Sequence, residues 1–506
     1  VDAGDHIQGT AYGSMDNGAT IIELMNEAGY DIATLGNHEF DYGMARAKAI
    51  IKEADFPYVS CNWVDLRTGL RVLPAVKLFP AGGKWIAFVG ITTPESFTKS
   101  TPAYFMNAKQ TKYIYDILGG DDGRKLYDAV QKAIDKAKTL GADIIIGLGH
   151  LGVDPSSSPW TSEEVIANTT GFDAFIDGHS HTVMENKQVY DAAGKAVTLT
   201  QTGSYLANVG KMTIAEDGAI TTELISTADV SDAAVAATAE AWINDVDAML
   251  GEQIATTDIK FYINDPATGK RRIRMGETNL GDFVADGIYT YFNEIEELHC
   301  DIAIMNGGGI RTDVEAGPWS FKTCKTVSPF GNVACLMSVT GQQIQDALEF
   351  GARFAGAEGK ENGGFLQVAG ARYTIHPMIP NTVQTNDKNV WTGSAATPRV
   401  SNVEIYDKTT GTYKPLDPNA TYALAGMNYT LRNLGDGFAM FDGATLIKDY
   451  VSEDYLVMSS YAAMFGGVDA NGLPHLASAN SPLADYPGYL LNYEDPYGAG
   501  RIQMIW

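Results

Sequence analysis

The apolar run at residues 30–36 is followed at once by the polar segment GNHEFDYG, residues 36–43. The run is typical of a buried strand. Open α/β sheets bind ligands at the carboxyl ends of their strands, so Asn37 and His38 are expected to line a site there. Imidazole, amide and carboxylate groups together can hold metal ions and move a proton. The alternative is a plain polar turn between a strand and a helix.

Three further clusters carry the same residue types and lie in the same half of the chain. They are DAGDHIQG at residues 2–9, GHLG at 149–152 and DGHSHT at 177–182. The four clusters hold five of the eight histidines, which chance would scatter along 506 residues: His6, His38, His150, His179 and His181. This joint pattern favours one site over a set of unrelated core or surface imidazoles.

Strands and helices alternate in the first half of the chain. Apolar spacing predicts three helices, at 17–29, 44–54 and 126–140, and three buried strands, at 85–92, 143–148 and 172–176. The last two strands lead to the clusters at 149–152 and 177–182, so all four clusters are expected at one edge of a layered α/β fold. His179 and His181 would point to opposite faces of a strand, so a bend is expected between them.

The second half of the chain differs from the first half in its local sequence pattern. It has glycine-rich loops, a short strand predicted at 400–406 and a helix predicted at 341–354. An Ala-rich stretch between the halves is predicted to be a helical linker. The predicted organisation is a first domain over residues 1–228, a linker helix over 229–256 and a second α/β domain over 257–506.

The chain has 36 Lys and Arg against 62 Asp and Glu, a net charge of −26. This charge argues against nonspecific binding to a nucleic acid polymer or an anionic membrane. A small anionic substrate would need a local positive site, made by metal ions and a few arginines. No run of about 18 apolar residues occurs, so no transmembrane segment is predicted. The four cysteines form no CxxC pair, and the sequence carries no signal for an oligomeric state.

On its four clusters the chain resembles the 5'-nucleotidase family of calcineurin-like metallophosphoesterases. The resemblance implies an N-terminal four-layer α/β/β/α sandwich, a separate C-terminal α/β domain and two divalent metal ions such as zinc or manganese. It implies that Asp5 bridges the ions, because a carboxylate can offer one oxygen to each. The remaining implied ligands are Asn37, His150 and His179 for one ion and His181 for the other.

His181 departs from the pattern of many family members, which have Gln or Asn at this position. A His there is also similar to the cyclic-nucleotide phosphodiesterase branch. This departure leaves the metal preference and the substrate range open.

His38 and Asp41 match the catalytic dyad of the family. The resemblance implies in-line attack on phosphorus by a metal-bound hydroxide, with His38 stabilising or protonating the departing oxygen. Asp41 would accept a hydrogen bond from the imidazole and hold its orientation. A further reading of Asp41, compatible with that role, is an N-cap for the helix that begins near residues 42–44.

The second half carries nucleotide-binding motifs of the same family. An apolar run leads to NGGGIR, residues 306–311, where glycines let the backbone approach a ligand and an Arg can grip phosphate. Phe330 and Tyr429 would stack on the base, and Asp436 would bind the ribose hydroxyls. The family usually has Phe at Tyr429, and the alternative for the two aromatics is packing in a core. The implied substrate-binding residues are Arg274, Asn306, Gly308, Arg311, Phe330, Tyr429 and Asp436.

The resulting prediction is a metal-dependent hydrolase of nucleoside 5'-monophosphates, with nucleoside di- or triphosphates or UDP-sugars as further substrates. One alternative is a 2',3'-cyclic-nucleotide phosphodiesterase. Another is a nucleotide-binding surface protein that has lost catalysis. The family resemblance implies a periplasmic, secreted or cell-surface location.

The chain begins at Val1, in a stretch that we interpret as the end of a strand. Members of this family carry an upstream Asp-x-His pair that completes the metal site shared by Asp5 and His181, and no spare pair in the chain could replace it. We therefore expect a further N-terminal strand in the natural protein and little phosphatase activity from the 506-residue chain alone.

Overall fold

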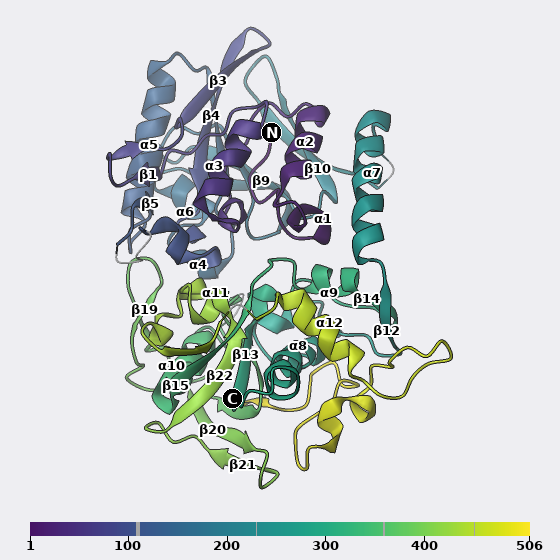
Figure 1. Ribbon diagram of the computed structural model, residues 1–506. Helices are drawn as coiled ribbons and strands as arrows, with labels where there is room; N and C mark the ends of the chain where they lie inside the picture. Colours follow the sequence, from purple (N-terminus) through teal and green to yellow (C-terminus); the bar gives the residue numbers. More distant parts are fainter. Residues whose placement is uncertain (108–111, 229, 358–359, 450) are drawn as a thin grey trace. The chain divides into compact units, whose positions relative to one another are not determined.

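The computed structural model describes residues 1–107, 112–228, 230–357, 360–449 and 451–506. By their contacts these residues form two compact units (Figure 1). Unit 1 contains Val1–Gln8 and Asp16–Ile243, and unit 2 contains Gly9–Met15 and Asn244–Trp506. The chain therefore passes between the units at three places, of which two flank the segment Gly9–Met15.

A six-stranded mixed sheet forms the centre of unit 1, in the order β3-β4-β6-β7-β9-β8. Its four inner strands run parallel, and each edge strand is antiparallel to its neighbour. All seven residues of β6 are buried, as expected for a central strand covered on both faces. The strands are β3 (Val76–Ala81), β4 (Lys84–Thr92), β6 (Ile144–His150), β7 (Ala174–Asp177), β8 (Val183–Tyr190) and β9 (Ala196–Thr202).

Helices α5 (Arg124–Thr139) and α6 (Ser162–Ala167) cover one face of this sheet. Apolar residues of α5 recur at helical spacing, and its buried stripe packs in one core with Ile145 of β6 and Phe175 of β7. This helix was predicted from the same stripe.

Extended segments form a second layer on the other face of the sheet. Parallel bridges join Asp2 to Ala33 and Ala33 to Tyr58 in this layer. Helices α2 (Ala19–Ala28) and α3 (Gly43–Glu53) cover its outer side. The two layers share a small core formed by Ile32, Val59 and Leu148. The order helix, strand, strand, helix confirms the predicted four-layer sandwich.

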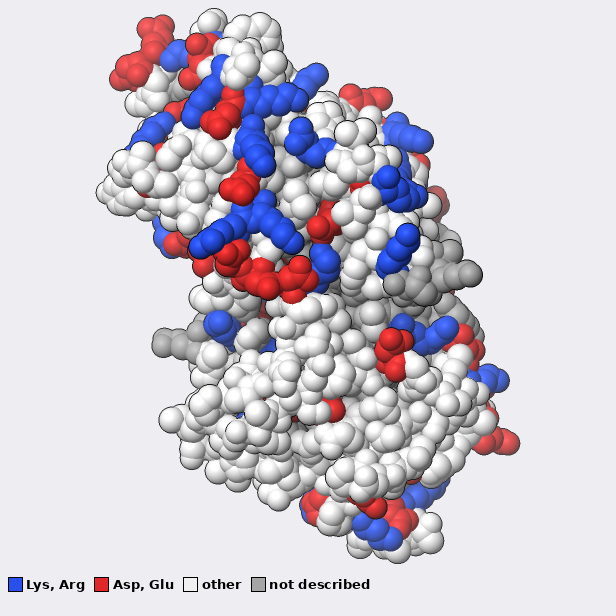
Figure 2. All heavy atoms as spheres, turned by 90° about the vertical axis from the view of Figure 1, so that its left-hand side faces the viewer, with Lys and Arg blue, Asp and Glu red and all other residues white. Residues whose placement is uncertain are grey.

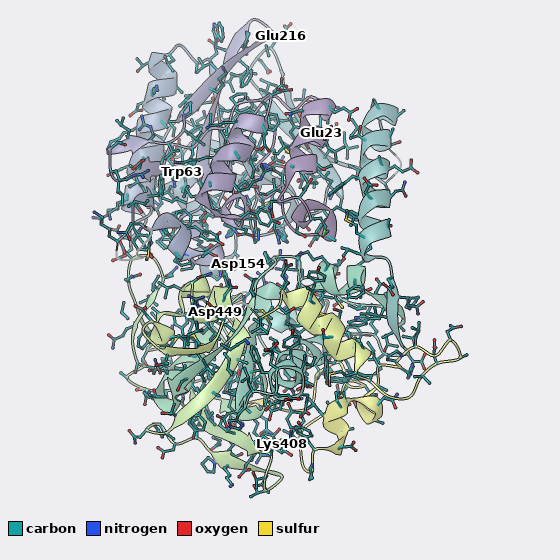
Figure 3. All side chains as sticks on the ribbon, in the orientation of Figure 1. Glu23, Trp63, Asp154, Glu216, Lys408 and Asp449 are labelled. Carbon is teal, nitrogen blue, oxygen red and sulfur yellow. The ribbon has the colours of Figure 1, made fainter. Side chains whose placement is uncertain are left out.

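The remaining elements of unit 1 are short. Trp63 of β1, which Figure 3 labels, is fully buried. Its ring centre lies 5.3 Å from that of Phe40 and fixes the turn that follows the run 30–36. Residues 32–36 of that run are buried, but the run forms isolated bridges only, so it is an extended segment rather than a full strand. These elements are β1 (Trp63–Asp65), β2 (Leu70–Arg71), β5 (Tyr115–Ile117), β10 (Asn208–Ile214), β11 (Ile220–Ser226) and α4 (Ser96–Lys99).

Unit 2 is built on a five-stranded sheet, β16-β13-β22-β15-β23, and a four-stranded sheet, β21-β20-β17-β24. The first sheet has β13 (Ile302–Asn306), β15 (Ala334–Thr340), β16 (Leu366–Ala369), β22 (Thr421–Met427) and β23 (Thr445–Lys448). The second has β17 (Ala371–Ile375), β20 (Val400–Asp407), β21 (Thr412–Pro415) and β24 (Ile502–Met504). Short pairs are β12 (Gln253–Thr257) with β14 (Gly317–Ser320) and β18 (Gln384–Thr385) with β19 (Trp391–Gly393).

Successive residues of β13 contribute to two different cores, because side chains alternate across a strand. Ala303 and Met305 pack on the side of helix α8, every residue of which is buried. Ile302 and Ile304 pack with α10 on the other side. The helices of unit 2 are α1 (Ala11–Ser14), α8 (Asn279–Thr290), α9 (Phe321–Val327), α10 (Gly341–Gly351), α11 (Asn428–Leu431) and α12 (Asp454–Ala463).

The predicted linker contains helix α7 (Ala233–Leu250), and residue 229 lies outside the described residues. The division between the units falls within α7, between Ile243 and Asn244. The domain limits expected from the sequence stay a prediction. Among the described residues, no helix combines the length and the apolarity needed to cross a membrane.

Candidate active site

Three of the predicted metal ligands meet in unit 1. Asp5, His150 and His179 each offer one ligand atom, and these atoms lie within 4.8 Å of one another. Asp5 follows the bridge at Asp2, while His150 ends β6 and His179 comes just after β7. Parallel neighbouring strands end at one edge of the sheet, so residues far apart in sequence arrive at one place.

The backbone turns sharply at these ligands. Asp5, His179 and His181 have φ values of 64°, 73° and 56°, in the left-handed region that non-glycine residues seldom occupy. Each such residue costs roughly 1–3 kcal/mol, which the surrounding structure must offset. The bend predicted between His179 and His181 is present for this reason. His181 lies outside the group whose ligand atoms are within 4.8 Å.

The carboxylate of Asp5 divides its two oxygens between different partners. Oδ1 accepts the backbone N–H of His38 at 2.7 Å, and Oδ2 lies 2.8 Å from Nε2 of His150. Burial alone would raise the pKa of Asp5, but the nearby imidazoles of His150 and His38 hold it well below its usual range. Oδ2 is therefore an ionised oxygen that faces the imidazoles.

The ring of His150 has a defined orientation. Nδ1 lies 2.7 Å from the carbonyl oxygen of Ala3 and must donate, because a carbonyl only accepts. Nε2 is buried and has no hydrogen bond of acceptable geometry within the described part of the chain, although Asp5 Oδ2 is close. Burial acts to lower the pKa of His150, but the charge of Asp5 raises it to about 9.

A divalent cation fits this arrangement. Nε2 of His150 and Oδ1 of Asn37 are both buried without a hydrogen-bond partner among the residues described, and both can donate a lone pair to a metal. Together with the carboxylate of Asp5 they form a mixed oxygen and nitrogen donor set, which suits zinc or manganese. A cation would also replace the proton that His150 otherwise holds next to Asp5.

The predicted dyad is in contact. Nδ1 of His38 lies 2.5 Å from Oδ2 of Asp41, and Nε2 of His38 lies 4.0 Å from Oδ2 of Asp5. Burial raises the pKa of Asp41, while the charge of His38 acts to lower it. The capping prediction for Asp41 is wrong: the N-cap position of α3 is Tyr42, and no side chain caps that helix. Asp41 instead closes the short 3₁₀ turn η1 (His38–Phe40) and holds His38.

Glu39 ties two of the clusters together, a role that sequence reasoning missed. Its side chain is fully buried and accepts three backbone N–H groups, from Gly36 at 2.6 Å, Asp5 at 2.9 Å and His6 at 3.0 Å. The loops touch so closely that a Cβ on Gly36 would lie 2.1 Å from Oδ1 of Asp5. The available signal was an acidic residue between two predicted site residues.

Asp177 joins the other two clusters, and Gln201 of β9 holds the second of them. Oδ1 of Asp177 accepts the N–H groups of Leu151 and Gly152, at 2.9 and 3.3 Å, and burial raises the pKa of this carboxyl. Oε1 of Gln201 accepts the N–H of Thr182 at 2.6 Å. Asp177 lies inside a predicted cluster, whereas no sequence signal marks Gln201 in β9.

The predicted nucleotide-binding residues gather in unit 2. Asn306, at the end of β13, donates to Oδ2 of Asp436 at 3.0 Å, and the backbone N–H of Asp436 donates to the hydroxyl of Tyr429 at 3.1 Å. Arg311 donates to the carbonyl of Gly308 at 3.3 Å, and its guanidinium lies 5.5 Å from the centre of the Phe330 ring.

Phe330 and Tyr429 are half-buried. Neither belongs to the two apolar cores of unit 2 in the part of the chain that the structure describes.

Arginines give this part of unit 2 a local positive charge. Nη1 of Arg274 lies 3.8 Å from Oε2 of Glu361, and the same oxygen lies 3.6 Å from Arg271. Nε of Arg274 is buried without a hydrogen-bond partner in the described ranges. Burial and the charges of Arg271 and Arg311 lower the pKa of Arg274 to about 9. An anionic ligand would relieve that repulsion, in a chain whose net charge is −26.

Comparison with known proteins agrees with this geometry. Residues 1–183 match the family described as calcineurin-like phosphoesterase, and residues 253–443 match the 5'-nucleotidase, C-terminal domain. The chain is 28% identical over 498 residues to a 5'-nucleotidase of Homo sapiens, covering 91% of this chain and 79% of that protein. It is 28% identical over 512 residues to the trifunctional nucleotide phosphoesterase protein YfkN of Bacillus subtilis (strain 168), covering 92% of this chain but only 32% of that protein.

A solved structure extends the likeness to the whole fold. The structure of a 5'-nucleotidase precursor from Thermus thermophilus has a TM-score of 0.77 and 25% identity, covering 100% of this chain and 89% of that chain. The layered fold and the converging donor set define a metal-dependent phosphoric monoester hydrolase. With the two matched domains in this order, the chain belongs to the 5'-nucleotidase family, whose phosphoesterase domain binds divalent metal ions.

Proposed function

We propose that the chain hydrolyses nucleoside 5'-monophosphates to nucleoside and phosphate with two divalent metal ions. The observation that carries the proposal is the approach of Asp5 Oδ2 to Nε2 of His150 at 2.8 Å, where a carboxylate oxygen faces a buried ring nitrogen that has no hydrogen bond among the described residues. Such an approach is stabilised by a cation between them. The ligands would be Asp5, Asn37, His150, His179 and His181.

Bound divalent ions supply Lewis-acid stabilisation of the charge on the phosphoryl oxygens. His38 supplies the proton. Its Nδ1 donates to Asp41, so in the protonated ring the second proton is on Nε2, which lies 4.0 Å from Oδ2 of Asp5 and would pass that proton to the departing ribose 5'-oxygen. The carboxylate of Asp41 stabilises the charged ring and keeps the same nitrogen turned towards the substrate.

Unit 2 would hold the rest of the nucleotide. Arg274 and Arg311 offer guanidinium groups to phosphate, and the half-buried rings of Phe330 and Tyr429 offer faces to the base. Asp436 would accept from the ribose hydroxyls, with Asn306 as its neighbour at 3.0 Å. The backbone at Gly308 has no side chain, so a ligand can approach it closely.

A small-molecule partner agrees with the surface as well. The net charge is −26, and on the face of unit 1 in Figure 2 the Lys and Arg side chains are interspersed with Asp and Glu. A nucleic acid polymer needs a continuous basic surface. We also propose an extracytoplasmic location, which is supported by the description of the Thermus relative as a precursor.

A second candidate, hydrolysis of 2',3'-cyclic nucleotides, is favoured by the imidazole at His181. Nucleoside di- and triphosphates and UDP-sugars are further candidate substrates, which the arginines of unit 2 favour. A nucleotide-binding protein without catalysis is disfavoured by the intact contact between His38 and Asp41.

The test is a phosphate-release panel across AMP, 2',3'-cyclic AMP, ATP and UDP-glucose with added zinc or manganese. For the natural protein we expect turnover of AMP that a chelator abolishes and that His150→Ala lowers together with metal content. Preferred turnover of the cyclic nucleotide would replace the main proposal with the second candidate. Metal-independent turnover, or none from a chain that binds two ions, would refute it.

A further inference from the structure

Glu95 lies beside the metal-ligand group, outside all four sequence clusters. Its side chain is 6% exposed, and its Oε2 lies 2.9 Å from Nε2 of His179. A carboxylate oxygen accepts a hydrogen bond at this distance, so Nε2 of His179 carries the proton of the pair.

The proton on Nε2 decides which nitrogen of His179 can bind a metal. In a neutral imidazole with Nε2 protonated, the lone pair is on Nδ1. His150 has the opposite arrangement, because its Nδ1 donates to the carbonyl of Ala3 and its Nε2 is the free donor. The two histidines would then bind through different nitrogens, although their ring centres are only 5.0 Å apart.

The local structure holds Glu95 in place. β4 pairs in parallel with β6, and the register sets Thr92 beside His150. Glu95 comes three residues later at the N-cap position of α4, and its carbonyl accepts the N–H groups of Thr98 and Lys99 at 2.9 and 2.8 Å. Its own N–H donates to the hydroxyl of Thr93 at 3.2 Å. The carboxylate is therefore presented from a fixed turn at the same sheet edge as the ligands.

We propose that Glu95 is a positioning residue that holds the proton of His179 on Nε2 and so presents Nδ1 to the metal. This inference rests on the proposed metal centre. Glu95 is not itself in the ligand group: among the described residues, that group contains Asp5, His150 and His179. Carboxylates that hold a metal-binding histidine in this way typically contribute about 10- to 100-fold to metal affinity.

The test measures zinc affinity by competition with a chromophoric chelator, on the full chain and without substrate. We expect Glu95→Ala to weaken zinc binding about 10- to 100-fold, and Glu95→Gln, which keeps a carbonyl acceptor, to weaken it less. Glu164→Gln is the matched control. Glu164 is an acidic residue of unit 1 that forms a capping box with Thr161 at the start of α6, so its loss should leave zinc affinity unchanged.

A second readout reports the nitrogen directly. Long-range ¹H–¹⁵N spectra of the zinc-loaded, histidine-labelled protein should place the proton of His179 on Nε2, with the signal assigned by its absence from His179→Ala. A proton on Nδ1, or wild-type zinc affinity in a folded Glu95→Ala variant, would overturn the proposal. If Glu95→Ala does not fold, the proposal would be overturned by equal zinc affinity of Glu95→Gln and the wild type together with a proton on Nδ1 of His179. Absence of zinc binding by the wild type would instead remove the metal centre itself.

Discussion

The two candidate binding regions hold their functional groups in different ways. In unit 1, buried acidic side chains accept backbone N–H groups from neighbouring loops, as Glu39 does for Asp5, His6 and Gly36. In unit 2, glycine-rich backbone and arginines dominate, and the charges of the arginines repel one another. The difference teaches that a metal site needs donors fixed before the ion arrives, while a site for an anion can leave positive charge uncompensated until the ligand binds.

Strain is distributed differently as well. Unit 1 has left-handed residues at three of the predicted ligands, Asp5, His179 and His181. In unit 2 the left-handed residues near the site are Leu434 and Asp436, in the loop that follows Tyr429. Both regions therefore place backbone strain where a side chain must point in one direction.

The largest expected effect separates chemistry from metal binding within unit 1. His38→Ala should lower kcat by about 10²- to 10⁴-fold, because the departing oxygen loses its proton donor. Bound metal, measured by mass spectrometry, should be unchanged. Loss of metal equal to that of His150→Ala would place His38 among the ligands instead.

The next prediction concerns a buried acid of unit 2, Asp454, which accepts the N–H of Asn332 at 3.2 Å next to the loop that carries Phe330. Burial raises the pKa of Asp454 to about 7, although Lys325 acts to lower it. The folded state then binds more protons than the unfolded state between about pH 4 and pH 7. Its contribution to stability is complete below the unfolded pKa and falls as pH rises through about 7.

We expect the free energy of unfolding of the wild type, relative to Asp454→Asn, to fall by about 4 kcal/mol between pH 4 and pH 8. Urea unfolding of both proteins at several pH values measures this difference. A difference that is flat, or that rises with pH, would contradict the assignment.

The third prediction tests the carboxylate that joins the loops of unit 1. Glu39→Gln replaces one acceptor oxygen with an amide N–H₂ group that faces backbone donors, so the loop of Asp5 should lose its fixed position. Zinc affinity should fall about 10- to 100-fold. Unchanged affinity in a folded variant would show that Glu39 does not position the ligands, and Glu164→Gln again serves as the control.

The smallest effect is expected in unit 2. Tyr429→Phe keeps the aromatic ring but removes the hydroxyl that accepts the N–H of Asp436. One such hydrogen bond contributes about 0.5–1.5 kcal/mol, so the KM for AMP should rise by roughly tenfold or less. Hydrolysis of a small aryl phosphate should be unaffected. A loss as large as that of Phe330→Ala, where a stacked base would cost roughly 1–3 kcal/mol, would mean that the hydroxyl orders the whole loop.

The sequence predicted the alternating strands and helices and the place of the polar clusters because both depend on local pattern, whereas the four layers were expected from the family resemblance. Apolar runs end where His150 and His179 begin, and the stripe of α5 has helical spacing. No apolar run or helical stripe in the sequence indicates the roles of Glu39 and Glu95. Glu39 meets Asp5 across 34 positions in sequence and Glu95 meets His179 across 84, so their roles arise only when the layers pack.

The N-cap of helix α3 shows a second reason why a prediction from sequence fails. An acidic residue just before a helix is a common cap, but Asp41 had a stronger partner in His38 at 2.5 Å. The charged hydrogen bond to His38 outweighed the preference of an acidic residue for the N-cap position. The roles of the residues in unit 2 rest on the family pattern, because glycines and arginines also serve plain turns and surfaces.

The segment Gly9–Met15 belongs to unit 2 although it begins four residues after Asp5. Its Tyr12 lies 4.9 Å beneath the ammonium of Lys322, which in turn pairs with Asp247. A fragment of the chain that ends at residue 243 would therefore contain unit 1 together with Gly9–Met15, a segment that belongs to unit 2. A fragment that starts at residue 244 would contain unit 2 without helix α1. Recombination that replaced the second half of the chain with that of a relative would therefore also have to replace residues 9–15, so that this segment matches the new unit 2.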